Sequence, residues 1–216
     1  MPVCSDCITG LDGWGDELRC TLCQRQVSHP ASLDDAGACG VCLSRPQVLD
    51  RVWTYGPYQG GLRQLVHLLK YDGMMPLATT LGERSSKTAD FGSEADLVVP
   101  APLHWTRRLE RGFNQSLLLA QVLARRSELP CVPRALRRKR ATPPQAGLSG
   151  ARRRASLRGA FEARRSLVEG RRVLLVDDVV TTGATIEACA RALKRAGARR
   201  VTAVAVARAQ LAQRAV

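Results

Sequence analysis

The apolar residues near the C-terminal end of the chain follow two different spacings. Residues 173–176, Val-Leu-Leu-Val, form an unbroken apolar run, which is typical of a strand buried in a parallel sheet. The spacing changes to that of a helix over 185–196, which Gly197 ends, and 201–207 is a second apolar strand. Strand, helix and strand in this order form a βαβ unit and predict an α/β fold, a parallel sheet flanked by helices.

The chain before this unit holds two more strands and two more helices by the same criteria. Residues 51–58 predict a short aromatic-rich strand ended by Gly-Pro, and 61–70 has apolar residues at helical spacing. Residues 96–99 predict an apolar strand that Pro100 stops, because proline has no N–H for a sheet ladder. A further helix is expected over 114–126.

Residues 134–172 are strongly basic. They hold 13 Arg or Lys against two Glu, with a central Thr-Pro-Pro-Gln-Ala-Gly sequence and Phe161 as the only aromatic residue. This composition predicts a mobile basic loop.

Composition divides the chain into a small N-terminal unit over 1–46 and one main domain over 47–216. With 45% hydrophobic and 24% charged residues, the chain is typical of a globular protein. No run approaches the roughly 20 apolar residues that a membrane span needs, and the N-terminus carries no visible secretory signal. We therefore expect a cytoplasmic protein with no membrane span.

The formal net charge is +14, from 33 Lys plus Arg against 19 Asp plus Glu. Such a charge attracts phosphate-rich partners and makes their association sensitive to salt. Nearly all of the cations are Arg, and Ala and Leu are abundant too, so a G+C-rich genome explains the composition equally well.

Six of the eight cysteines fall before residue 43, in three C-x2-C pairs. In a cytosolic chain, cysteines indicate metal ligands or inert thiols rather than disulfides. The second and third pairs have the C-x2-C-x15-C-x2-C spacing of a structural Zn2+ site. The expected ligands are Cys20, Cys23, Cys39 and Cys42. The first pair, Cys4 and Cys7, could be half of a second site, could replace one of the other pairs, or could be a relic.

Two adjacent acids, Asp177 and Asp178, follow the 173–176 strand at the edge where ligands bind in open α/β sheets. A turn with three threonines comes next and leads into the 185–196 helix. Its backbone N–H groups, the helix dipole and the threonine hydroxyls predict a cradle for a phosphate dianion. Gly183 permits the close approach of the phosphate.

This segment resembles the phosphoribosyl pyrophosphate (PRPP) signature of type I phosphoribosyltransferases. The resemblance implies that the acids hold the ribose hydroxyls, that the turn holds the 5′-phosphate, and that Mg2+ binds with PRPP. The residues it assigns to PRPP binding are Asp177, Asp178, Val179, Val180, Thr181, Thr182, Gly183, Ala184 and Thr185.

Three more motifs lie elsewhere in the chain. They are Leu69-Lys70-Tyr71-x-Gly73, then Val99-Pro100-Ala101-Pro102-Leu103-His104 with Arg107 and Arg111-Gly112-Phe113-Asn114-Gln115, and then Arg140-x-Thr142-x-x-Gln145 with Arg153. Together with the cysteine ribbon they resemble the ComF family of competence-associated phosphoribosyltransferase-like proteins, including its GntX-like members. The resemblance covers essentially the whole chain and implies a type I phosphoribosyltransferase fold with an N-terminal zinc ribbon.

The ComF resemblance also implies roles for single residues. Arg107 and Arg111, with Asn114 and Gln115, are expected on the pyrophosphate side, because the planar guanidinium holds two phosphate oxygens at once. Lys70 is expected to join them in PRPP binding. The catalytic residues would be Asp177, Asp178 and Arg111.

The resemblance further implies that 137–158 is a flexible lid that excludes water from the reaction. The lid residues expected to contact pyrophosphate are Arg140, Thr142, Gln145 and Arg153. Ser156 stands where the family usually has Asn, which bears on the details of the lid.

The function implied by the resemblance is a PRPP-dependent transferase, or a PRPP sensor, in DNA uptake, with an acceptor that the sequence does not identify. The alternative is a PRPP-responsive competence factor that binds single-stranded DNA and DNA-uptake proteins without transferase turnover. The basic stretch favours binding, whereas an aromatic content of 4% is low for base stacking. A third hypothesis is a zinc-organised structural adaptor.

Overall fold

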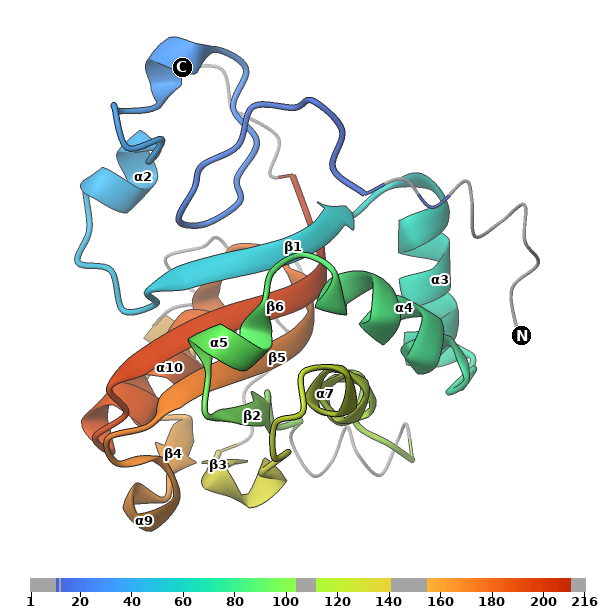
Figure 1. The fold of residues 1–216 in the computed structure, drawn as a ribbon, viewed down its shortest axis with the longest axis vertical. Coiled ribbons are helices and arrows are strands. Elements are labelled where there is room, and N and C mark those ends of the chain that lie inside the picture. The colour runs from blue at the N-terminus through green and yellow to red at the C-terminus, as the bar shows by residue number, and fades with distance from the viewer. Residues whose placement is uncertain (1–10, 12, 104–111, 141–154, 211–216) are drawn as a thin grey trace.

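The centre of the molecule is a four-stranded parallel sheet (Figure 1). The computed structural model describes residues 11, 13–103, 112–140 and 155–210. In order across the sheet, the strands are β1 (Arg51–Pro57), β6 (Arg200–Arg208), β5 (Arg172–Val180) and β2 (Leu97–Pro100). The predicted parallel sheet flanked by helices is confirmed.

Helices cover both faces of the sheet. On one face lie α3 (Gly60–Tyr71), α4 (Leu77–Ser86) and α7 (Gln115–Arg126), and on the other lies α10 (Ala184–Arg195) (Figure 1). Successive residues of β5 point to opposite faces, so Val173 and Leu175 pack in the core with α10, whereas Leu174 and Val176 pack with the other three helices. Burial on both faces explains the unbroken apolar run of this strand.

Two elements differ from the sequence-based expectation. Strand β5 continues beyond 173–176 to Val180, because its partner β6 extends equally far and pairs Asp177 with Ala205. Helix α4 was not anticipated. Its apolar positions are interrupted by Thr, Gly, Glu and Ser, but Leu77 and Leu81, one turn apart, are fully buried against the sheet and α7.

The ends of the basic stretch are ordered, so the prediction of a mobile loop throughout 134–172 is wrong. The short η2 (Pro133–Ala135) leads into β3 (Leu136–Arg138), which pairs antiparallel with β4 (Phe161–Ala163), and α9 (Arg165–Val168) follows. Leu136 and Phe161 are buried in the core beside α10, and this burial holds the two strands down. Residues 141–154 lie outside the described ranges.

The N-terminal region runs along the outer edge of β1 (Figure 1). It contains η1 (Pro30–Ser32) and α2 (Gly40–Leu43). The backbone N–H of Val52 donates to the carbonyl of Leu22 at 2.8 Å, and the indole N–H of Trp14 donates to the carbonyl of Thr54 at 2.9 Å. These bonds satisfy groups that an edge strand would otherwise expose.

One further helix, α5 (Phe91–Glu94), leads into β2. It brings Asp96 to Arg172, whose guanidinium and backbone N–H both donate to that carboxylate. No helix in the described ranges is long and apolar enough to cross a lipid bilayer.

Candidate functional site

A cavity of about 240 Å³ lies at the carboxyl end of β5. Its walls come from the end of α3, residues 101–103, the start of α7, the last residues of β5 and the start of α10. These segments are distant in sequence, and the parallel sheet brings them together because β2 and β5 end on the same edge. The predicted site residues Asp177, Asp178 and Lys70 all line this cavity.

Asp177 is fixed by two hydrogen bonds to one carboxylate oxygen. The hydroxyl of Ser116 and the backbone N–H of Asp178 each donate to its Oδ1, both at 2.9 Å. Burial, and then the adjacent charge of Asp178, raise the pKa of Asp177 to about 7. The group is therefore poised between its neutral and charged forms near physiological pH.

Asp178 forms an ion pair with Lys70 from the last turn of α3. The Nζ of Lys70 lies 3.0 Å from Oδ1 of Asp178, and the two side chains are 16% and 13% exposed. Burial acts to lower the pKa of Lys70, but the charges of Asp178 and Asp177 outweigh it, so the net pKa is raised. Lys70 is thus a cation with its charge held inside the cavity.

The threonine turn lines the same cavity. Gly183 is the N-cap of α10 and has φ of 83°, in the left-handed region that a glycine adopts without steric cost. The hydroxyl of Thr182 accepts from the N–H of Ala184 at 3.4 Å. Thr181, Thr182 and Thr185 line the cavity where the first N–H groups and the positive dipole end of α10 favour an anion.

Two more predicted residues, Asn114 and Gln115, line the same cavity, but their side chains are hydrogen-bonded to the backbone of neighbouring segments. Asn114 is the N-cap of α7, with its side-chain oxygen accepting from the N–H of Ser116 and its amide donating to the carbonyl of Ala101. The amide of Gln115 donates to the carbonyl of Lys70 at 3.4 Å. Both residues therefore brace the segments that carry Lys70 and Ser116.

The remaining signature residues divide between the cavity and the core. Val179 lines the cavity, as does Ala184 at the first position of α10, whereas Val180 is buried in the core on the α10 side. The predicted residues that lie outside the described ranges are Arg107, Arg111, Thr142, Gln145 and Arg153.

Arg140, predicted as a lid residue, forms hydrogen bonds at the base of the β3–β4 segment. Its guanidinium donates to the carbonyls of Ser156 at 3.1 Å and Arg158 at 3.2 Å, so it joins the two sides of that segment. Sequence reasoning missed Ser116 and Arg138, which both line the cavity. The position of Ser116 directly after the Asn-Gln motif was the available signal for that residue.

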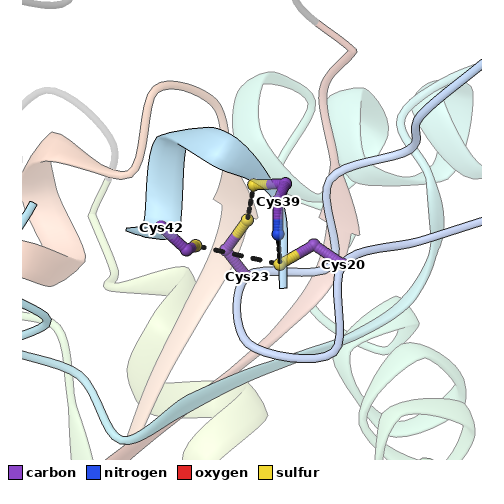
Figure 2. A group of neighbouring side chains, drawn as sticks. All are labelled: Cys20, Cys23, Cys39 and Cys42. Carbon is purple, nitrogen blue, oxygen red and sulfur yellow. Dashed lines mark hydrogen bonds between the residues drawn. The ribbon is translucent and has the colours of Figure 1, made fainter. Parts of the chain in front are cut away.

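A second candidate site is the cluster of Cys20, Cys23, Cys39 and Cys42 (Figure 2). The four sulfur atoms lie within 4.8 Å of one another. The Sγ atoms of Cys20 and Cys42 are 3.8 Å apart, and those of Cys23 and Cys39 are 3.9 Å apart. The two C-x2-C pairs thus converge, and the cluster could hold a metal ion.

The cluster is shielded from water, and the hydrogen bonds among its thiols raise the pKa of Cys23 and Cys42 while they lower that of Cys20. Cys20, Cys39 and Cys42 are buried, and the backbone N–H of Cys39 points at Sγ of Cys20 at 3.3 Å. Hydrogen bonding with Cys23 and then with Cys42 lowers the pKa of the Cys20 thiol. Cys4 and Cys7 lie outside the described ranges.

The class of protein follows from the fold and from a family match. Residues 114–215 match the phosphoribosyl transferase domain family. This match covers α7, β5, α10 and β6, which supply part of the cavity walls. The chain has the type I phosphoribosyltransferase fold, with a four-cysteine cluster in its N-terminal region.

Curated relatives are similar over most of the chain. DNA utilization protein YhgH of Escherichia coli (strain K12) is 34% identical over 190 residues, which are 85% of this chain and 81% of that protein. Competence protein F of Haemophilus influenzae is 31% identical over 206 residues, 88% of this chain and 90% of that protein. Competence protein ComFC of Bacillus subtilis is 27% identical over 180 residues. This chain belongs to the ComF family.

Among solved structures, the chain is similar to glutamine PRPP amidotransferase from Bacillus subtilis, in a complex with ADP and GMP. The two are 26% identical, with a TM-score of 0.42, over 59% of this chain and 25% of that one.

Proposed function

We propose that this protein binds PRPP in the cavity at the end of β5. The binding domain would span 47–216 and follow a zinc ribbon over 1–46. The observation that carries the proposal is that an acid pair, a largely buried lysine and the first turn of α10 line one cavity of about 240 Å³.

The chemistry of the walls supports this ligand. Vicinal ribose hydroxyls are good donors to carboxylates, and Asp177 and Asp178 both line the cavity. A phosphate is a good acceptor for the N–H groups of Thr181, Thr182 and their neighbours at the start of α10. Lys70 supplies a positive charge that could turn from Asp178 to the pyrophosphate on binding.

In the proposed transfer, an acceptor attacks the anomeric carbon of the ribose and pyrophosphate leaves. Mg2+ would enter with PRPP at the part of the cavity that Asp177 and Asp178 line, and it would offset the negative charge of the pyrophosphate. Arg107 and Arg111 are proposed to stabilise the leaving pyrophosphate, and the 137–158 segment is proposed to exclude water. Ser116 would keep Asp177 oriented towards the ribose, because its hydroxyl already holds that carboxylate.

Calorimetric titration with Mg2+-PRPP tests the proposal. The variant Asp177→Asn/Asp178→Asn should lose saturable binding, whereas Asp35→Asn/Asp72→Asn, which removes the same charge from exposed positions, should bind as the wild type does. Circular dichroism of both variants checks that each is folded. If the wild type showed no saturable binding of Mg2+-PRPP, the proposal would be wrong.

A role in DNA uptake is proposed from the relatives, which are named as competence and DNA utilization proteins. We propose that the protein acts in the cytoplasm, where its cysteines stay reduced. The net charge of +14 favours the second candidate function, binding of single-stranded DNA without transferase turnover. Fluorescence anisotropy of a labelled oligonucleotide at two salt concentrations, with and without PRPP, tests it. If the oligonucleotide binds only very weakly, and if PRPP does not change that binding, the result would count against this function.

The metal of the cysteine cluster is proposed to be Zn2+ in a structural role. Sulfur ligands about 2.3 Å from a tetrahedral zinc lie about 3.8 Å from each other. The Cys20–Cys42 and Cys23–Cys39 separations of 3.8 and 3.9 Å match this geometry. Four thiolates leave no open coordination position, which supports a structural rather than a catalytic metal.

A further inference from the structure

A second cavity, of about 360 Å³, lies beside the proposed PRPP site and is larger than it. One wall is a stripe of residues along helix α10, which packs against β4. The other wall is the segment 155–159, which precedes β4, together with the first residue of that strand. The volume lies within the range of small-molecule sites in proteins.

The charged residues that line this cavity are all arginines. Arg191 and Arg195 come from successive turns of α10, and Arg158 comes from the facing segment. Arg191 forms an ion pair with Glu187 at 3.1 Å. Arg158 and Arg195 form no ion pair with a carboxylate of the residues that the structure describes. The cavity therefore has an excess of positive charge, which favours an anionic ligand.

The inner surface of the cavity is apolar, so a matching ligand carries an apolar group as well as negative charge. Leu157, Phe161 and Ala184 line the cavity and are buried, and Ala188 is half-buried, whereas the three arginines are exposed. A planar heteroaromatic ring can pack on this surface and can also stack on a guanidinium group. A nucleotide combines such a ring with a chain of phosphates.

This cavity shares a wall with the proposed PRPP site. Leu157 and Ala184 line both cavities, and Ala184 is the first residue of α10. Phe161 provides a further link. It lines the second cavity, and the centroid of its ring lies 5.5 Å from the guanidinium carbon of Arg138, which lines the PRPP cavity. A ligand in one cavity is therefore separated from a ligand in the other by a single layer of side chains.

We propose that the cavity between α10 and residues 155–159 is an effector site for a nucleotide. The arginines hold the phosphates, and the apolar surface takes the base. Two polyanions on either side of a shared wall repel each other, because the wall excludes much of the water that would screen their charges. A bound nucleotide therefore weakens PRPP binding. The nucleotide site stands without the proposed function, whereas its effect on PRPP rests on that function.

Calorimetric titration of the purified full-length chain with ATP tests the site. Arg191→Gln/Arg195→Gln should lower the ATP affinity about tenfold or more, because hydrogen bonds between charged groups and phosphate are lost. Arg171→Gln/Arg199→Gln removes the same charge from exposed positions outside the cavity and should bind ATP as the wild type does. Ala188→Leu fills the cavity without changing its charge and should also weaken ATP binding. Circular dichroism checks that each variant is folded.

Two further ligands test the assignment to a nucleotide. Adenosine lacks the phosphates and inorganic triphosphate lacks the base, so each should bind more weakly than ATP. Triphosphate that bound as tightly as ATP would overturn the assignment. Equal ATP affinities for the two double-arginine variants, or no ATP binding by the wild type, would overturn the site itself.

The affinity for PRPP, measured with and without saturating ATP, tests the effector role. ATP should lower it about fivefold, and PRPP should lower the ATP affinity by the same factor. The effect should vanish in Arg191→Gln/Arg195→Gln, which should still bind PRPP. An effect of ATP that persisted in this variant would indicate competition inside the PRPP cavity and would overturn the proposal, as would equal PRPP affinities with and without ATP. A wild type that bound ATP but not PRPP would end the proposed function and leave the nucleotide site standing.

Discussion

The two candidate sites of this protein are built in opposite ways. The cysteine cluster takes all four ligands from one short stretch, between Cys20 and Cys42, on two local turns. The cavity at the end of β5 takes its charged groups from helix α3 and strands β3 and β5, which are far apart in the chain. A site of the first kind is visible as a spacing in the sequence, whereas one of the second kind exists only after the sheet has formed.

The sites also differ in how their charge is balanced. The cavity contains its own counter-ion, because Lys70 lies 3.0 Å from Asp178. The cluster gathers four ligands of like charge once ionised and needs a cation to hold them together. We therefore expect the cysteine region to depend on its metal for folding and the cavity to be formed without its ligand.

The largest expected effect is the loss of the metal ligands. Cys20→Ser/Cys23→Ser should remove bound zinc and unfold the N-terminal region, because this region has few apolar residues of its own and structural zinc contributes about 10 kcal/mol or more. Metal analysis and amide hydrogen exchange measure the two outcomes. Cys131→Ser, at a cysteine outside the cluster, should keep the zinc, and an unchanged zinc content in the double variant would contradict the dependence.

The next largest effect concerns the internal counter-ion of the cavity. Lys70→Met leaves Asp178 beside Asp177 without its cation and should lower the free energy of unfolding by about 3 kcal/mol. Urea denaturation measures the loss. Adding Asp178→Asn to this variant should restore part of it, because the unpaired charge is then gone.

Lys87→Met is the matched control for that substitution, since Lys87 is exposed at the end of α4. It should change the unfolding free energy by less than about 0.5 kcal/mol. If Lys70→Met changed the unfolding free energy as little as Lys87→Met, the ion pair between Lys70 and Asp178 would not stabilise the cavity. The proposed difference between the cavity and the cluster would then be wrong.

A pH-dependent effect follows from the raised pKa of Asp177. Its carboxyl binds a proton more tightly when folded, with a pKa of about 7, than in the unfolded chain. Stability from this group is therefore present below the unfolded pKa near 4 and is lost as pH rises towards 7, by about 1.4 kcal/mol per unit at most.

The isosteric variant Asp177→Asn isolates the pH dependence of stability that comes from Asp177. Its amide oxygen can still accept from Ser116, but it does not titrate. The difference in Tm between the variant and the wild type should grow in favour of the variant between pH 5 and pH 7.5. A difference that stays constant with pH would show that Asp177 is not shielded as described.

The smallest expected effect concerns the threonine turn. Like the cysteine cluster, this part of the cavity is built from residues that are close together in the sequence. Gly183→Ala places a side chain at φ of 83° and should cost about 1 kcal/mol. A Cβ atom added at Gly183 would make only ordinary van der Waals contact, so the expected loss of stability comes from backbone strain. Gly61→Ala, within α3 and without a positive φ, should be neutral or slightly stabilising. Chemical denaturation of both variants checks the contrast.

Much of the fold was readable because its signals are local. The apolar run at 173–176 identified a buried parallel strand, and the C-x2-C spacings identified a cluster whose four sulfur atoms do converge. Helix α4 escaped notice because its polar residues obscure the pattern, although Leu77 and Leu81 are fully buried. Burial of Leu136 and Phe161 likewise gave structure to a stretch whose charge had predicted a loop.

The sequence by itself determined the elements whose signals are contiguous: the strands, the cysteine pairs and the threonine turn with Gly183 at its end. Only the tertiary structure decided which distant side chains meet. It brought Ser116 to Asp177 and Lys70 to Asp178. The physical reason is that spacing along the chain specifies local geometry, whereas the partner of a buried charge depends on which strands and helices end at the same edge of the sheet.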